Sequence, residues 1–366
     1  GLSVTTGVDN ALIGAFAGDA LTDADFNTVV GTAALSADTL GSRSTALGYG
    51  TLGSQNFSSA TDTYNVAVGH SAGNNVTTGI QNTLIGGLAG DALTDADFNV
   101  VIGYNALSAD TQGSRSTAIG RSALGSQNFT SATDSYNTAV GFNAGASVTT
   151  GVSNTLIGGQ AGDALTDADL NVALGNMALS SDTLGGLSTA IGYQALKTQN
   201  FTSATSTYNV AVGYNAGVLV TTGIQNTIIG GNAGDALTDA DRNTVLGYQA
   251  LTTDTQGSRT VAIGFNALAT QNFTSATDTY NTAVGYGAGE VITTGNFNTL
   301  VGGLTGDSLT TGSYNVYVGT HAGGSDDLGS ASVGIGYGAL SSLNYAGVTS
   351  GFNVAVGYNC LNDQTT

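Results

Sequence analysis

A five-residue pattern of one polar residue, three mostly apolar residues and a glycine recurs along the whole chain. It first appears as Asn10-Ala-Leu-Ile-Gly14 and last as Asn353-Val-Ala-Val-Gly357, and we count twenty copies. Its Val, Ile, Leu and Thr residues favour a β-strand, whereas glycine, Thr and Asn disfavour a helix. Each copy therefore predicts one short strand that ends at a glycine.

The glycines that close the pattern are regularly spaced. Their spacings run 17, 17, 21 and 17 residues, and this series of 72 residues repeats without a slip. A fixed period means that each unit stacks on its neighbour, and 17 residues are too few for a helical-pair repeat. We therefore predict an all-β fold, a parallel β-solenoid (β-roll or β-helix) of about twenty coils in five 72-residue blocks. Residues 1–297 are expected to form four near-identical regular blocks, and residues 298–366 a divergent final block, a cap or a junction.

Both faces of the predicted strand are apolar. The residue before each glycine is always Val, Ile or Leu, as at Ile13 and Val30, and we expect this row to form the solenoid core. The residue before that, as at Leu12 and Val29, points to the opposite face and is also mostly apolar. A strand that is apolar on both faces is buried on both, so we expect identical copies to cover the second face. The alternative is that this face carries small residues in the open.

Polar and aromatic positions also recur in every coil. The first position is Asn in fifteen coils, and stacked Asn side chains form hydrogen-bonded ladders. The predicted structural ladder includes Asn10, Asn27, Asn65, Asn82, Asn99 and Asn137. An often aromatic residue follows the glycine, as at Tyr49, Tyr104 and Tyr358. These rings are expected to stack along one side, with sugar binding as a second interpretation.

The longer spacing inserts residues after the third coil of each block. Each insertion carries an aromatic residue, and these are candidate receptor-binding residues on a repeated edge loop: Phe57, Phe129, Phe201, Phe273 and Tyr345. Loops on a rigid scaffold commonly carry recognition, so a glycan or receptor contact is one interpretation. The other is that each ring covers a seam or packs on a neighbouring chain.

Charge and motif content narrow the function. Twenty-five acidic against six basic residues give a net charge of −19, which disfavours nucleic acid and anionic membrane surfaces as partners. No apolar run is long enough to insert into a membrane as a helix. Acidic segments such as Asp91-Ala-Leu-Thr-Asp-Ala-Asp97 could hold calcium, but a solvated acidic corner is the interpretation that we adopt. No catalytic arrangement recurs, so we expect no enzyme, no metal and no cofactor.

The repeats resemble those of known fibrous proteins. The strings Asn281-Thr-Ala-Val-Gly-Tyr-Gly-Ala-Gly289 and Thr310-Thr-Gly-Ser-Tyr-Asn-Val-Tyr-Val-Gly-Thr-His-Ala-Gly323 are similar to repeats of bacteriophage tail fibres. They also resemble the head repeats of trimeric autotransporter adhesins (YadA-like), which are homotrimers of parallel β-rolls with shorter coils. The resemblance implies a structural, homotrimeric fibre, most simply a tail-fibre shaft on a virion that presents contacts with a host-surface glycan or protein. A trimeric adhesin on the bacterial extracellular surface is the alternative.

Two other classes of solenoid make distinct predictions. An ice-binding solenoid needs Thr-x-Thr in register on a flat face, and threonine does not recur in that way here. A polysaccharide-binding or polysaccharide-degrading β-helix enzyme needs acids clustered on adjacent coils. The Asp-rich segments return only every fourth coil.

Overall fold

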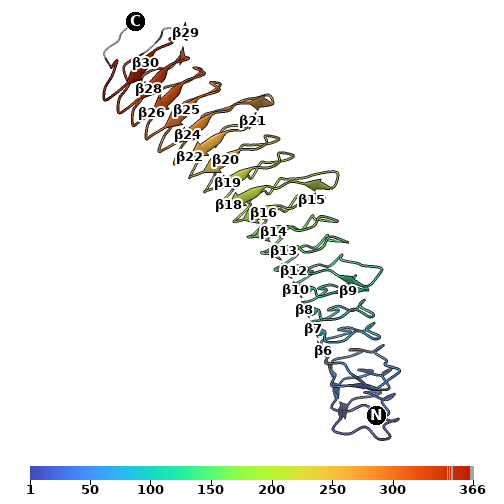
Figure 1. Cartoon of the computed structure of the whole chain (residues 1–366). Helices are drawn as coiled ribbons and strands as arrows, with labels where there is room; N and C mark the ends of the chain where they lie inside the picture. Colours follow the sequence, from blue (N-terminus) through green and yellow to red (C-terminus); the bar gives the residue numbers. More distant parts are fainter. Residues whose placement is uncertain (344, 346, 348, 363–366) are drawn as a thin grey trace. The chain divides into compact units, whose positions relative to one another are not determined.

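The structure, a computed structural model, forms a parallel β-solenoid of about 20 turns. It describes residues 1–343, 345, 347 and 349–362, and these residues contain no helix. The chain groups into two compact units, residues 1–186 with 202–204 and residues 187–201 with 205–366. Within each unit, successive turns stack with their strands along one side (Figure 1). The predicted solenoid is therefore confirmed, and the predicted division of the repeats at residue 298 stays a prediction.

Each turn of the first unit contributes one three-residue strand, and neighbouring strands pair in parallel without any shift in register, as in Ala11↔Thr28 and Ile13↔Val30. The strands of this unit are β1 (Ala11–Ile13), β2 (Thr28–Val30), β4 (Thr45–Leu47), β6 (Val66–Val68), β7 (Thr83–Ile85), β8 (Val100–Ile102), β10 (Thr117–Ile119), β12 (Thr138–Val140), β13 (Thr155–Ile157) and β14 (Val172–Leu174).

The second unit repeats this arrangement. Its three-residue strands are β16 (Thr189–Ile191), β18 (Val210–Val212), β19 (Thr227–Ile229), β20 (Thr244–Leu246), β22 (Val261–Ile263), β24 (Thr282–Val284), β25 (Thr299–Val301), β26 (Val316–Val318), β28 (Val333–Ile335) and β30 (Val354–Val356). Two-residue strands pair each longer turn with the regular turn before it, and they are β3 (Gly41–Ser42), β5 (Thr61–Asp62), β9 (Gly113–Ser114), β11 (Thr133–Asp134), β15 (Gly185–Gly186), β17 (Thr205–Ser206), β21 (Gly257–Ser258), β23 (Thr277–Asp278), β27 (Gly329–Ser330) and β29 (Thr349–Ser350).

The prediction of which strand face forms the core is wrong. The middle residue of each strand points inward, and Val29, Ala46 and Leu84 have no exposed surface. The residue before the glycine points outward, and Leu47 and Ile85 keep 45% and 37% of their surface exposed. The interior is narrow, and the middle residues share it with buried side chains from the turns. The uniform aliphatic row therefore lies on the outside of the solenoid.

The glycine after each strand is required by its backbone and by its neighbour. Gly86 has φ +137°, a conformation that L-residues rarely adopt. A methyl group on Gly86 would also lie 2.7 Å from the carbonyl carbon of Gly103 in the next turn. Stacked turns therefore approach one another closely at this row, which explains why the glycine recurs in every turn.

The first position of the pattern ties adjacent turns together. The backbone N–H of Asn82 donates to Asn65 Oδ1 over 2.9 Å, and that of Asn99 donates to Asn82 Oδ1 over 3.0 Å. The Nδ2 of Asn82 donates to the carbonyl of Ala96 over 2.8 Å. Asn10, Asn27 and Asn137 make the same kind of contacts. The ladder therefore runs mainly from side chain to backbone, and it satisfies polar groups that the narrow interior removes from water.

Candidate interaction surface

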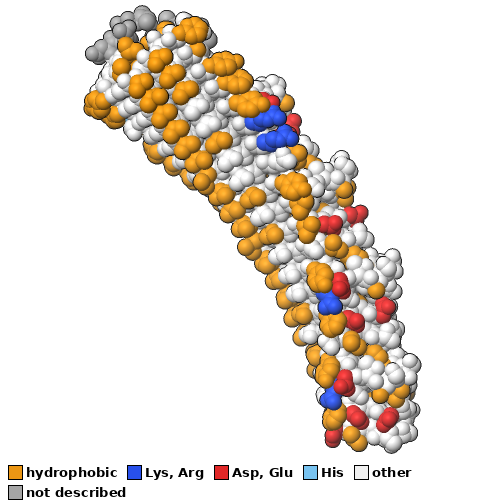
Figure 2. Space-filling view, viewed as in Figure 1, with side chains coloured by type: hydrophobic (Ala, Val, Ile, Leu, Met, Phe, Trp, Pro, Cys, Tyr) orange, Lys and Arg blue, Asp and Glu red, His pale blue; other side chains and the backbone are white. Residues whose placement is uncertain are grey.

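The outer strand face carries no charged side chain in any of the twenty three-residue strands. We define it as the first and third residues of the three-residue strands, which are Thr, Val, Ile or Leu with a single Ala, at Ala11. None of these strands contains a charged residue, although the chain carries a net charge of −19. Figure 2 shows hydrophobic side chains gathered along the strand edge of each unit. The acidic residues are therefore kept off a regular surface of branched side chains, whose third position is always apolar and whose first position is Thr in eleven of the twenty strands.

Aromatic rings border this face. Phe265 follows the glycine that closes a copy of the pattern, and its ring lies between those of Tyr248 and Tyr286. The ring centroid of Phe265 is 5.8 Å from that of Tyr248 and 5.3 Å from that of Tyr286, and the planes are nearly parallel. A second row precedes the ladder Asn, and there Arg115 lies 4.7 Å from the ring centroid of Phe98 and 6.0 Å from that of Tyr136. Rings and guanidinium groups thus stack from turn to turn, as the sequence predicts for the first row.

The edge-loop aromatics do not offer exposed rings. Phe57, Phe129, Phe201 and Phe273 keep only 6–8% of their surface exposed. The backbone N–H of Phe129 donates to Asp110 Oδ1 over 3.1 Å, which fixes the loop against the interior. Burial favours the packing interpretation of these residues over direct receptor contact. Tyr345, the fifth member, is half-buried and lies among residues of which 344, 346 and 348 are not described.

A buried polar network lies beneath each regular edge loop. Gln127 Nε2 donates to Asp110 Oδ2 over 2.6 Å, and Gln127 Oε1 accepts from Asn137 Nδ2 over 2.8 Å. Asp110 Oδ1 also accepts from the backbone N–H of Gly113 over 3.0 Å. Burial raises the pKa of Asp110 above its ordinary value, and the hydrogen bonds from Gln127 and the backbone oppose that shift. Sequence reasoning missed this network, although its Asp and Gln are one turn apart.

In the last turns the network has different members. Leu343 stands where the other blocks have glutamine, so both hydrogen-bonding functions of the amide are lost. The hydroxyl of Tyr317 instead donates to Asp326 Oδ2 over 3.0 Å. The hydroxyl of Tyr345 accepts from Asn353 Nδ2 over 2.6 Å. Two tyrosines therefore replace the donor and the acceptor of one glutamine.

Glycines make room for these tyrosines. A methyl group at Gly323, where the other blocks have leucine, would lie 2.8 Å from the Cζ atom of Tyr317. Gly334 replaces alanine and would meet the same ring at 3.3 Å. A methyl group at Gly351, where the other blocks have serine or threonine, would lie 2.9 Å from the Cζ atom of Tyr345. The divergence of the last turns is thus a concerted set of exchanges.

The acidic segments do not converge on a common point. Asp97 Oδ1 accepts from the backbone N–H of Ile80 over 2.8 Å, and Asp95 Oδ1 accepts from the hydroxyl of Thr94 over 3.1 Å. Asp91 turns inward, and burial raises its pKa. Among the residues that the structure describes, no group of three or more His, Cys, Asp or Glu side chains is placed to hold a metal ion.

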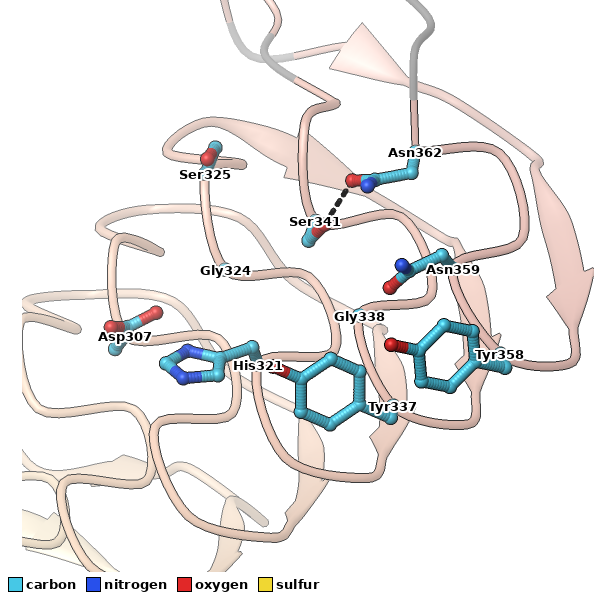
Figure 3. Close-up of a pocket in the computed structure, with 10 residues that line it drawn as sticks. All are labelled: Asp307, His321, Gly324, Ser325, Tyr337, Gly338, Ser341, Tyr358, Asn359 and Asn362. Atoms are coloured by element: carbon cyan, nitrogen blue, oxygen red, sulfur yellow. Dashed lines mark hydrogen bonds between the residues drawn. The ribbon is translucent and has the colours of Figure 1, made fainter.

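A groove opens on the side of the last turns (Figure 3). It has a volume of about 470 Å³, and its lining side chains come from four successive turns. The larger ones are Asp307, His321, Tyr337, Tyr358 and Asn359. The sequence pattern places Tyr358 in an aromatic row but does not bring it together with Asp307 and His321. The sequence signal that could have located the groove is the pair Gly324 and Gly338, because most other blocks have a larger residue at these two positions.

In the described part of the chain, no helix is long and apolar enough to cross a membrane. A comparison with protein-family models and a comparison with curated proteins both found no match.

Proposed function

We propose that this chain is a structural fibre segment that assembles as a homotrimer through its outer strand face. The most fitting context is the shaft of a bacteriophage tail fibre that presents contacts with the host surface. The observation that supports this proposal is the uncharged outer face of the strands, with its unbroken row of Val, Ile and Leu before the glycines, in a chain with a net charge of −19. Contiguous apolar patches of this kind mark interaction sites when they occur on soluble proteins.

The energetics favour covering this face. Fully burying a Val, Leu or Ile side chain contributes roughly 1.5–3 kcal/mol, so a side chain that is half-exposed stands to contribute about 1 kcal/mol more. An outward Val, Ile or Leu recurs in every turn, and eight of these twenty residues, among them Leu47, Ile85 and Leu246, are 37–65% exposed. Copies arranged in parallel around a common axis bring identical rows together along the whole segment, which suits a closed rotational symmetry.

The solution mass tests the proposal. Light scattering of the purified chain should give about three times the chain mass of 36.1 kDa. The double variant Leu47→Glu with Ile85→Glu puts two carboxylates on the outer face and should weaken assembly. The matched control, Ser58→Glu with Ser59→Glu, adds the same charge to an exposed edge loop and should remain trimeric. A monomeric wild-type chain, or equal dissociation of both variants, contradicts the proposal.

A bacterial trimeric surface adhesin would share this assembly. The mass measurement does not separate it from a tail fibre, because both are trimers of the same surface. The sequence that adjoins this segment in its gene does separate them. A tail-attachment domain favours the phage fibre, and a membrane-anchor domain favours the adhesin.

A further inference from the structure

The groove of the last turns combines an aromatic platform with polar groups. Tyr337 and Tyr358 stack with ring centroids 5.2 Å apart and an angle of 11° between their planes. They keep 49% and 77% of their surface exposed. Because each ring covers one face of the other, the ring edges and the outer face of Tyr358 are what remains open. His321 meets Tyr337 edge-on, with centroids 6.1 Å apart and an angle of 84°. The imidazole therefore stands at the end of the platform rather than continuing the stack.

Hydrogen-bonding groups occupy the other side of the groove. Asp307 Oδ1 is buried and has no hydrogen-bond partner. Asn359 is exposed beside Gly338, and the Asn362 amide accepts a hydrogen bond from the Ser341 hydroxyl. Figure 3 shows Asp307 beside His321 at one end of the row of rings and Asn359 beside Tyr358 at the other, with Asn362 next to Ser341. The groove thus offers a carboxylate acceptor together with amide donors and acceptors.

The repeated chain supplies its own comparison for this groove. The position of Gly324 is occupied by Ser36, Ser108, Ser180 and Thr252 in the other blocks. The Thr252 hydroxyl donates to Asp235 Oδ1 over 2.5 Å, so a side chain here covers the aspartate that corresponds to Asp307. The corresponding oxygens of Asp19, Asp91 and Asp163 also lack a partner. What distinguishes the last turns is the missing side chain at Gly324, and Asp307 and Gly324 both belong to the lining of the groove.

We propose that this groove binds a short neutral oligosaccharide of a surface glycan. The apolar face of one sugar ring can pack on the outer face of Tyr358, because tyrosine presents a large rigid surface at low entropic cost. Hydroxyls of that unit then accept from the amide of Asn359, and hydroxyls of a unit further along the groove donate to Asp307. The carboxylate and the net charge of −19 disfavour acidic sugars.

This inference deepens the proposed function, because it names the class of host-surface ligand. The expected affinity is low for one sugar. At about 0.3 kcal/mol per heavy atom, a hexose of about twelve heavy atoms binds with roughly 4 kcal/mol, which corresponds to a Kd near 1 mM. Three copies in a trimer raise the avidity for a surface glycan without any new contact.

The test uses the full chain and a panel of neutral gluco-, galacto- and manno-configured trisaccharides. Saturation-transfer NMR should show binding of at least one of them, with a Kd of about 1 mM or below. Tyr358→Ala should weaken that binding at least tenfold. Gly324→Thr should do the same, because it restores the side chain that covers the aspartate in another block. The matched control is Tyr286→Ala, which removes the corresponding exposed ring from the preceding block and should change nothing.

The outcomes separate this inference from the proposed function. A trimer that binds none of the trisaccharides overturns the saccharide site and leaves the structural role intact. Binding that survives both Tyr358→Ala and Gly324→Thr also overturns it, because the ligand then sits elsewhere. A monomer that binds a trisaccharide and loses it in both variants supports the site and contradicts the trimeric fibre.

Discussion

The buried network beneath the edge loop allows a sharp test of what holds a turn together. We consider Gln127→Leu, which exchanges the amide for an apolar side chain of similar length. The change removes the 2.6 Å bond to Asp110 Oδ2, the 2.9 Å bond to Ser116 Oγ and the 2.8 Å bond from Asn137 Nδ2. Ser116 Oγ keeps its 2.6 Å contact with Ser135 Oγ. Asp110 keeps its two backbone donors, and Asn137 Nδ2 keeps the carbonyl of Gly151 at 2.7 Å. One carboxylate oxygen and one amide hydrogen are therefore left in the interior without a partner.

The expected cost follows from these two groups. A hydrogen bond to a charged group contributes about 1.5–3 kcal/mol, and a bond between neutral groups contributes about 1 kcal/mol. The loss should therefore destabilise the block locally by about 3 kcal/mol. This corresponds to a roughly hundredfold increase in the equilibrium constant for local opening, and hence in the rate of hydrogen exchange. Hydrogen exchange measures this quantity turn by turn, and the unaltered block around Asp254 and Gln271 serves as an internal control.

The last turns suggest how to rescue the variant. Their two tyrosines and three glycines perform the same tasks around a leucine, so the whole set can be moved into the earlier block. The transplanted variant carries Gln127→Leu, Val101→Tyr, Leu107→Gly, Ala118→Gly, Phe129→Tyr and Ser135→Gly. It should recover most of the lost protection. Recovery should be incomplete, because Ser332 Oγ has no partner in the natural arrangement.

Two results would refute this reasoning. If Gln127→Leu alone changes exchange in its block by less than about threefold, the network does not contribute as its geometry indicates. If the transplanted variant opens as fast as Gln127→Leu alone, the tyrosines do not replace the amide. In both cases the exchange pattern of the unaltered block must match that of the wild type.

Two further predictions follow from the backbone and from burial. Gly86→Ala should destabilise the solenoid by at least about 3 kcal/mol, because Gly86 has a φ of +137° and an added methyl group would clash with Gly103. In the control variant Gly87→Ala the methyl group meets only the side chain of Tyr104, at 3.5 Å, so the thermal unfolding midpoint should stay close to that of the wild type. The buried Asp110 should make the fold more stable at mildly acidic pH, because burial raises its pKa in the folded state above the ordinary value of 3.8. The stability gained from protonating Asp110 is then complete below pH 3.8 and is lost as the pH rises through the pKa of the folded state. The urea midpoint should therefore increase as the pH falls from about 7 towards 4, and Asp110→Asn should reduce that change; an unchanged pH profile in the variant would contradict the assignment.

The period alone was sufficient to predict the solenoid, because identical spacing leaves stacking as the only regular arrangement. The ladder Asn and the glycine were predicted for the same reason. The edge loops were harder, since an inserted aromatic residue is compatible with an exposed ring or a packed one. Asp110 and Gln127, 17 residues apart, decide the matter, because their hydrogen bonds draw the loop and Phe129 inward. The groove depends on missing side chains, which a search for reactive residues does not detect.

The sequence does contain a signal for which residue of each strand points inward. An interior position must match the volume of its neighbours, so its residues should vary in compensation, whereas an outer position can stay uniform. Leu84 is followed six residues later by Gly90, whose added methyl group would lie 3.0 Å from Leu84 Cδ2. Ala118 is followed at the same distance by the fully buried Leu124.

The same volume rule extends to the last block, where the exchange is largest. Tyr317 takes the inward position that is valine or alanine in the other blocks, and Gly323 follows it where they have leucine. The ring then fills the space of the missing leucine and brings its hydroxyl to Asp326. Compensation between positions six residues apart thus marks the core row in these turns, but not in the fourth turn of each regular block, where Ala67, for example, is followed by Gly73. The outer row of Val, Ile or Leu needs no such compensation within its own chain. Self-association would explain why this exposed row is nevertheless always aliphatic.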